Sequence, residues 1–410
     1  MVRLFVLSMM ILLVSGCAAT TAQEIQPTAP PTAQAHATEP AAFPTADATP
    51  MATSAAPTAP STPTPLLNAE LATLATTWQQ ANQGEAEATA LLYFGAQSPS
   101  SLILWRFPLD GSGTAQPIST APWTPLGTPV GALSPDEQWV AYIIGDQPTP
   151  GFELHLLRSD GSSDQVIAMT GIHSDCAPEF AWVGNEAHLV YRVGGGRFFR
   201  SYLPTTNSER DVLDLPDGAY LLGGDRNERI LLAVEREANQ SQNIVSVDLA
   251  TGAQTILAPM PQPERERLFC RKGSPDGSQL LFAIGESPYQ PYLFDRLTGQ
   301  SRATDMVPNQ AFWGSDSQHI LALAGTLPGS LSVHALPAMT VVSTAVLPLL
   351  APGLENLSVV STAPDGQWLV GCTVNATDQQ SWLYHMPTQT WQQLPAGRSD
   401  CVNVVGWPTR

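Results

Sequence analysis

A tight-turn sequence followed by an apolar stretch recurs along the chain. The clearest copy is residues 274–284, S-P-D-G-S-Q-L-L-F-A-I, and related copies occur at residues 134–142 and 363–370. Proline presets the second position of a type I turn, Asp suits the third and Gly the fourth. The run that follows is rich in β-forming apolar residues and has no polar alternation. Each copy therefore predicts a turn that leads into a strand covered on both faces.

Weaker copies fill the intervals between the clear ones. Turn residues at 184–185, near Asp225 and at 315–316 each precede a short apolar run. Successive copies lie roughly 40 to 50 residues apart, which is the period of a four-stranded propeller blade. Most turns also follow a further short apolar strand, at residues 130–133, 180–183, 220–222 and 311–313.

A second element follows each buried strand: an alternating strand, a polar turn and another strand. Two copies carry a D-x-x-T-G turn, at residues 244–257 and 292–299. Looser copies bring the number of these units to seven, at residues 102–111, 154–161, 198–204, 331–334 and 382–385.

One strand is displaced to the far end of the chain. The first unit begins at its second strand, residues 90–94, and residues 401–407 supply a strand with no partner of its own. Trp407 in that strand matches Trp182 and Trp313 in register. The pattern predicts an all-β, seven-bladed β-propeller with a three-plus-one strand closure that hides its sheet edges. Six or eight blades are the alternatives if a weak copy is misread.

The S-P-D-G turn with its apolar strand, together with the D-x-x-T-G turn, resembles the WD-like propeller repeats of TolB-like and prolyl-oligopeptidase-type proteins. The resemblance covers residues 88–410 and is strongest in three repeats. It implies the propeller fold and an extracytoplasmic location. Function varies widely among such propellers and transfers poorly between them.

The N-terminal residues have the features of an export signal. Arg3 precedes an apolar run at residues 4–14, which is too short to cross a bilayer of roughly 30 Å as a helix. Residues 14–17, V-S-G-C, resemble the bacterial lipobox. The resemblance implies that residues 1–16 are a signal peptide and that Cys17 carries a lipid anchoring the protein to the membrane. A plain secretory signal is the alternative.

Two further segments separate this signal from the propeller. Residues 17–65 consist mainly of Ala, Thr and Pro and are predicted to form a disordered stalk. Leu67, Leu71, Leu74 and Trp78 share one face of a helix that follows Pro65. We predict a short amphipathic helix over 66–84, packed on the propeller at 85–410.

Charge and motif content limit the classes of function. The net charge of −18 argues against nucleic-acid binding and against direct binding of the domain to an anionic membrane surface. Lys272 is the sole lysine, so any Schiff-base chemistry would depend on it. The sequence contains no G-x-S-x-G, H-E-x-x-H or C-x-x-C motif, and we expect no peptidase domain, metal or cofactor. We expect a monomer.

The segments that lead into the inner strands contain the strongest candidate site. The tripeptide S-D-C occurs at 174–176 and 399–401, and residues 265–272 gather four of the few cations. Cations concentrated in an acidic domain could hold an anionic ligand. The alternative is structural: Asp caps the loops and Arg pairs with local Glu. The candidate ligand-binding residues are Asp175, Asp400, Arg265, Arg267, Arg271 and Lys272.

Four cysteines besides Cys17 allow two disulfides in an oxidising compartment. We favour Cys372 with Cys401, because both are expected near one face of adjacent blades. Such a bond would lock the closing strand and add roughly 3–4 kcal/mol by the chain-entropy model. Cys176 with Cys270 would span more than one blade step and is less favoured.

These observations predict a lipid-anchored extracytoplasmic propeller that binds a protein, peptide or glycan. The rival class is an enzyme of lyase, lactonase or glycosidase type, with polar residues from several blades converging on the central channel. Three or more carboxylates or histidines on the axis would favour that rival. A third possibility is an envelope-assembly factor similar to TolB.

Overall fold

The computed structural model describes residues 68–410 with thirteen gaps. The gaps are residues 99–100, 123–129, 147–150, 171–178, 194–197, 215–218, 236–241, 262–267, 285–288, 325–328, 349–356, 375–378 and 396–401. The predicted signal peptide 1–16, the predicted lipidation site Cys17 and the predicted stalk 17–65 therefore lie outside the described residues and stay predictions.

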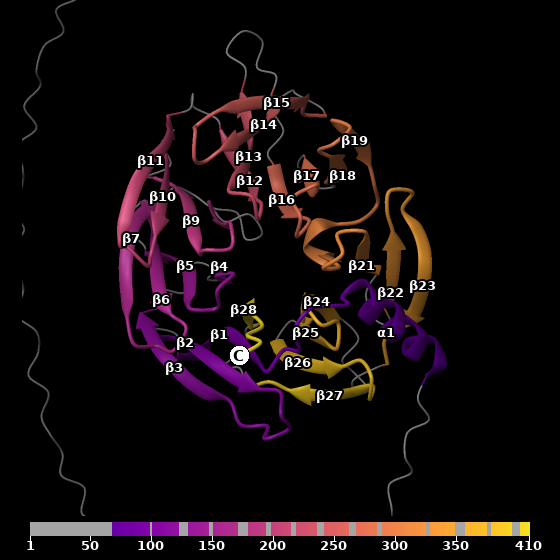
Figure 1. Cartoon of the computed structure of the whole chain (residues 1–410). Coiled ribbons are helices and arrows are strands. Elements are labelled where there is room, and N and C mark those ends of the chain that lie inside the picture. The colour runs from indigo at the N-terminus through magenta and orange to yellow at the C-terminus, as the bar shows by residue number, and fades with distance from the viewer. Residues whose placement is uncertain are drawn as a thin grey trace, which may run out of the picture. The chain divides into compact units, whose positions relative to one another are not determined.

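The described residues form seven four-stranded antiparallel sheets arranged in a ring, which is a seven-bladed β-propeller (Figure 1). Blade 1 contains β28 (Asn403–Gly406), β1 (Ala90–Ser98), β2 (Ser101–Pro108) and β3 (Gln116–Pro122). Blade 2 contains β4 (Val130–Leu133), β5 (Trp139–Asp146), β6 (Gly151–Arg158) and β7 (Asp164–Thr170). Blade 3 contains β8 (Phe180–Val183), β9 (His188–Arg192), β10 (Phe198–Leu203) and β11 (Ser208–Asp214).

The remaining four blades follow in chain order. Blade 4 contains β12 (Tyr220–Gly224), β13 (Arg229–Glu235), β14 (Gln242–Asp248) and β15 (Gln254–Pro259). Blade 5 contains β16 (Leu268–Gly273), β17 (Gln279–Ile284), β18 (Gln290–Asp295) and β19 (Gln300–Ala303). The short 3-10 helix η1 (Pro308–Gln310) precedes blade 6, with β20 (Ala311–Trp313), β21 (His319–Ala324), β22 (Ser330–Ala335) and β23 (Thr340–Val346). Blade 7 contains β24 (Leu357–Thr362), β25 (Trp368–Val374), β26 (Gln379–His385) and β27 (Thr390–Gln393).

The ring closes as predicted, because β28 pairs antiparallel with β1 and completes blade 1. The residues after β28 strengthen this closure. The Thr409 amide and hydroxyl donate to the carboxylate of Glu137 in blade 2, with the hydroxyl 2.6 Å from Oε1. The Thr89 amide donates to the Pro408 carbonyl at 2.8 Å. The three-plus-one closure and the count of seven blades are therefore confirmed.

The S-P-D-G repeat forms the turn that was predicted, and its side chains explain its composition. In blade 5 the Gly277 amide donates to the Ser274 carbonyl at 2.9 Å. The Ser274 hydroxyl accepts from the Gln279 amide and donates to Asp276. Gly277 has φ of 70°, a conformation that glycine adopts without steric cost. The turn leads into β17, all of whose residues are buried.

We call the seven innermost strands the inner ring. Three matching tryptophans link neighbouring blades at this ring. Trp182 Nε1 donates to the Ala132 carbonyl at 3.0 Å, from blade 3 back to blade 2. Trp313 Nε1 donates to the Lys272 carbonyl at 3.0 Å, from blade 6 back to blade 5. Trp407 Nε1 donates to Ser361 Oγ at 2.9 Å, from blade 1 back to blade 7. The predicted register of these tryptophans is confirmed, and it recurs as one contact between blades.

The helix α1 (Ala69–Ala81) lies within the predicted range and packs on the propeller. The Asn68 side chain caps it by accepting from the amides of Glu70 and Leu71. Its buried face joins an apolar cluster that includes Leu331 of blade 6 and Tyr384 of blade 7. The helix therefore stabilises the junction of these two blades. Within the described residues, no helix has the length and hydrophobicity needed to cross a membrane.

Candidate functional site

Two of the six predicted ligand-binding residues, Arg271 and Lys272, lie among the described residues. Both are on β16, the innermost strand of blade 5, which faces the centre of the ring (Figure 1). Lys272 is the fifth of the six residues of β16, so it lies near the turn end of the strand. The other four candidates, Asp175, Asp400, Arg265 and Arg267, lie outside the described residues, and their role stays a prediction.

Lys272 contacts blade 6 and is partly accessible to solvent. Its ammonium group donates to the Ala311 carbonyl at 2.9 Å and lies 4.0 Å from the ring centroid of Phe312. Across the described residues, no carboxylate lies within ion-pairing distance of this ammonium. Burial lowers the pKa of Lys272 to about 7, because partial removal from water disfavours the charged form.

Arg271, the neighbouring residue, interacts with Glu179, which lies directly before β8 in blade 3. Successive residues of a strand point to opposite faces, so Arg271 and Lys272 leave β16 on opposite sides. Burial lowers the pKa of Arg271 to about 10, and the charge of Glu179 opposes that shift. Arg271 thus belongs to a charged group that joins blades 3 and 5.

Glu179 is the buried member of that group, with a relative exposure of 4%. Its Oε1 lies 3.8 Å from a guanidinium nitrogen of Arg192, which is too long for a strong charge-assisted hydrogen bond. Its Oε2 has no hydrogen-bond partner in the part of the chain that the structure describes. Burial raises the pKa of Glu179, and the positive charges of Arg271 and Arg192 offset that rise only in part.

Sequence reasoning missed Glu179. It follows the segment 174–176 by three residues and precedes the first apolar residue of β8. The sequence offered one indication of its role, namely that it is a single charged residue immediately before a predicted inner strand. Arg271, whose charge acts on Glu179, lies two blades away in the sequence, and a short motif does not encode such a distant interaction.

Cys270 and Cys372 are both disulfide-bonded. Both are almost fully buried, Cys270 beside Arg271 on β16 and Cys372 on β25. Cys401 and Cys176 lie outside the described residues, so the pairing Cys372–Cys401 and the less favoured pairing Cys176–Cys270 stay predictions. Disulfides persist in oxidising compartments and are rare in the cytosol.

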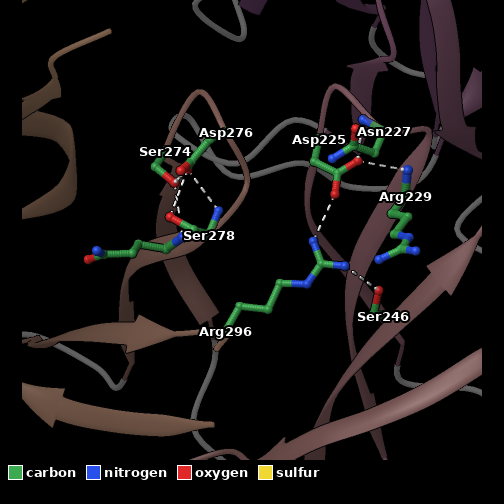
Figure 2. A network of polar contacts seen from close by, with 9 residues as sticks. Asp225, Asn227, Arg229, Ser246, Ser274, Asp276, Ser278 and Arg296 are labelled. Carbon is green, nitrogen blue, oxygen red and sulfur yellow. Dashed lines mark hydrogen bonds and ion pairs between the residues drawn. The ribbon is translucent and has the colours of Figure 1, made fainter. Parts of the chain in front are cut away.

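A second polar cluster joins the turns of blades 4 and 5 (Figure 2). A guanidinium nitrogen of Arg296 lies 2.7 Å from Asp225 Oδ2, and another donates to Ser246 at 3.2 Å. The second carboxylate oxygen of Asp225 accepts from the amides of Asn227 and Arg229. Both charges are paired and hydrogen-bonded, so this cluster is a clamp between blades.

The described residues contain no group of three or more His, Cys, Asp or Glu side chains placed to hold a metal ion. Glu179 is a buried carboxylate whose charge acts on Arg271 of the inner ring. The convergence of three acidic or histidine side chains on the axis, which would favour an enzyme, is not seen among the residues described.

We compared the chain with family models, curated proteins and solved structures. No family model matches the chain, and no curated protein matches it. Solved structures that resemble it include TolB from Acinetobacter baumannii (13% identity, TM-score 0.42), aligned over 77% of this chain and 65% of that protein. Others are an oligogalacturonate lyase in complex with manganese (15%, 0.48, covering 75% and 86%) and the periplasmic gluconolactonase of Pseudomonas aeruginosa (14%, 0.49, covering 78% and 99%). These similarities are too low to support a function, and the seven-bladed fold rests on the sheet topology.

Proposed function

We propose that this protein is an extracytoplasmic propeller, anchored to the cell envelope by a lipid on Cys17, that binds a protein, peptide or glycan partner at its inner ring. The observation that carries the proposal is Lys272, a cation on the inner ring with no carboxylate partner among the described residues. A cation that serves only the fold is normally paired when it is removed from water. An unpaired one is therefore available to a ligand.

Two observations support the compartment. Cys270 and Cys372 are disulfide-bonded, which fits an oxidising environment. The sequence V-S-G-C at residues 14–17 follows an apolar run typical of an export signal. Together they favour a protein that is exported and then held at the membrane surface.

Site-specific photo-crosslinking in intact cells tests this proposal. A photoreactive residue replaces Ser358 on the inner strand β24 and, as the matched control, Arg302 on the outer strand β19. We expect a discrete crosslinked partner from position 358 and none from position 302. Crosslinks from position 302 alone, or no product from position 358, would contradict binding at the inner ring. Recovery of a cell-envelope complex from position 358 would narrow the function to envelope assembly.

The second candidate is an enzyme with a site at the inner ring. It is favoured by Glu179 and Lys272, whose pKa values burial shifts in opposite directions toward neutrality. Such perturbed groups are concentrated at catalytic sites. A thermal-shift screen against divalent metals, sugars and lactones separates the candidates. A metal-dependent shift, with turnover that Glu179→Gln abolishes, would favour the enzyme.

A further inference from the structure

We propose that Lys272 binds the carboxylate group of an anionic ligand at the junction of blades 5 and 6. This inference rests on the proposed binding function and adds to it the chemistry of the ligand. It concerns the ammonium group of Lys272 and its neighbours Ala311 and Phe312 in blade 6.

The contacts of Lys272 leave hydrogen-bonding capacity for a ligand. A lysine ammonium has three N–H donors. One of them is directed at the Ala311 carbonyl, and the ring of Phe312 covers another side of the group. These contacts hold the ammonium in place without neutralising its charge. Lys272 as a whole is partly accessible to solvent, and we place the ligand on the accessible side of the residue.

The electrostatics of the site favour an anion over a neutral ligand. The pKa of Lys272 is lowered by burial, and no charge of the described residues contributes to that shift. A carboxylate beside the ammonium would restore the attraction that water supplies in the unfolded chain. Arg271 does not substitute for Lys272, because its charge acts on Glu179 at the opposite side of β16.

The same electrostatics favour a ligand group with a single negative charge. Lys272 provides one positive charge, and Glu179 and the net charge of −18 oppose a more highly charged anion. The apolar ring of Phe312 also suits a carboxylate better than a fully hydrated phosphate. A carboxylate therefore matches the site in charge.

Binding should be accompanied by proton uptake at Lys272. Only the charged ammonium attracts a carboxylate, and the bound carboxylate raises the pKa of Lys272. Affinity is thus greatest below pH 7, where the lysine is already protonated. Above pH 7 it falls about tenfold per pH unit until the pH reaches the raised pKa of the complex.

The sole lysine makes a direct measurement possible in the intact protein. Selective ¹³C labelling of lysine gives one side-chain NMR signal, from Lys272. Without a carboxylate, we expect that signal to titrate with a midpoint of about 7. Saturating acetate should raise the midpoint by at least about one unit, whereas chloride at equal ionic strength should not. An unchanged midpoint in acetate, or an equal shift in chloride, would overturn the proposal.

Further probes identify the source of the carboxylate. N-acetylglycinate represents the end of a peptide, glucuronate represents a sugar acid, and inorganic phosphate tests the charge. A larger shift with either carboxylate supports the proposal and indicates the source. A larger shift with phosphate than with both carboxylates would overturn it.

Variants provide a second readout, the rise in melting temperature on adding the carboxylate. Wild type and Arg302→Met, which removes an exposed cation of the same blade, should respond alike. Lys272→Met should lose the response and Lys272→Arg should retain it, and a full response in Lys272→Met would refute the site. If position 358 crosslinks a partner while carboxylates leave the lysine unaffected, the carboxylate assignment fails and the binding function stands.

Discussion

Two of the cations in blade 5, Arg296 and Lys272, are in opposite situations. Arg296 follows β18 at the outer turn and lies 2.7 Å from Asp225, and the side chains of this pair are 15% and 2% exposed. Lys272 is on the innermost strand and contacts a carbonyl and an aromatic ring, with no carboxylate nearby among the described residues. Both residues belong to blade 5 and are positively charged, but among the described residues only Arg296 has a carboxylate partner.

The difference separates scaffold from candidate site. A buried ion pair with further hydrogen bonds on both partners holds two blades in register. A partly buried cation without a counter-ion lowers the stability of the fold at neutral pH, because its charged form is disfavoured. Proteins tolerate such groups mainly where they serve a function. Substitutions at the two places should therefore change stability in opposite directions.

The largest loss of stability is expected from Asp225→Ala. This substitution leaves the guanidinium of Arg296 buried without its partner and also removes the acceptor of two backbone amides. Breaking a buried pair from one side costs about 3–5 kcal/mol. Urea unfolding measures the change. Asp248→Ala, at the end of β14 and outside the ion pairs of the described residues, is the control and should lose much less. Equal losses would show that the ion pair between Asp225 and Arg296 adds nothing to the free energy of unfolding.

Lys272→Met should instead stabilise the fold at neutral pH. The folded-state pKa of Lys272 lies below the unfolded value, so the unfolded chain binds more protons between pH 7 and pH 10. Wild-type stability should therefore rise with pH in this window, by up to about 1.4 kcal/mol per unit. The variant should lack that rise and gain about 2–4 kcal/mol at pH 7. Parallel stability–pH curves for the two proteins would contradict the desolvation of Lys272.

Gly277→Ala should disturb Arg296, which is paired with Asp225, and leave Lys272 unaffected. The added Cβ would lie 2.3 Å from Cβ of Asp225, and the backbone of Gly277 has φ of 70°. We expect a loss of about 2 kcal/mol from the strain and from displacement of Asp225. The lysine NMR midpoint should stay where it is. A changed midpoint would show that the Gly277 turn and Lys272 are coupled through blade 5.

The smallest effect is expected from Phe312→Leu. Loss of the aromatic face removes the attraction between the ring and the ammonium of Lys272. This attraction favours the charged form, so the pKa of Lys272 should fall further, by about half a unit. The lysine NMR titration measures it. A rise in the midpoint would mean that the ring acts mainly by excluding water.

The fold was predictable because its signal is local and repeated. A turn such as residues 274–277 identifies one blade wherever it stands, and Trp407 at the far end of the chain identifies the displaced strand. Each signal needs only a few adjacent residues. The helix was predictable for the same reason, since Leu71, Leu74 and Trp78 share one face at helical spacing.

The site was less predictable because its contacts join distant blades. The sequence pointed to Arg271 and Lys272 through their rarity in an acidic chain. It contained no indication that Glu179 would approach Arg271, or that Lys272 would face Phe312 and leave Arg271 on the other side. Which of two adjacent cations is paired depends on how neighbouring inner strands pack, and no local spacing encodes that.

The closure of blade 1 also has a consequence for how the protein reaches its native state. Leu92 in β1 pairs with Gly406 in β28, so two strands from opposite ends of the described chain must meet. Contacts between such distant segments form slowly, because a long loop must be ordered before they stabilise anything. Until β28 has been synthesised, β1 presents an unpaired edge to which a strand of another chain can add. The final few residues of the ring therefore decide when the newly made protein ceases to be prone to aggregation.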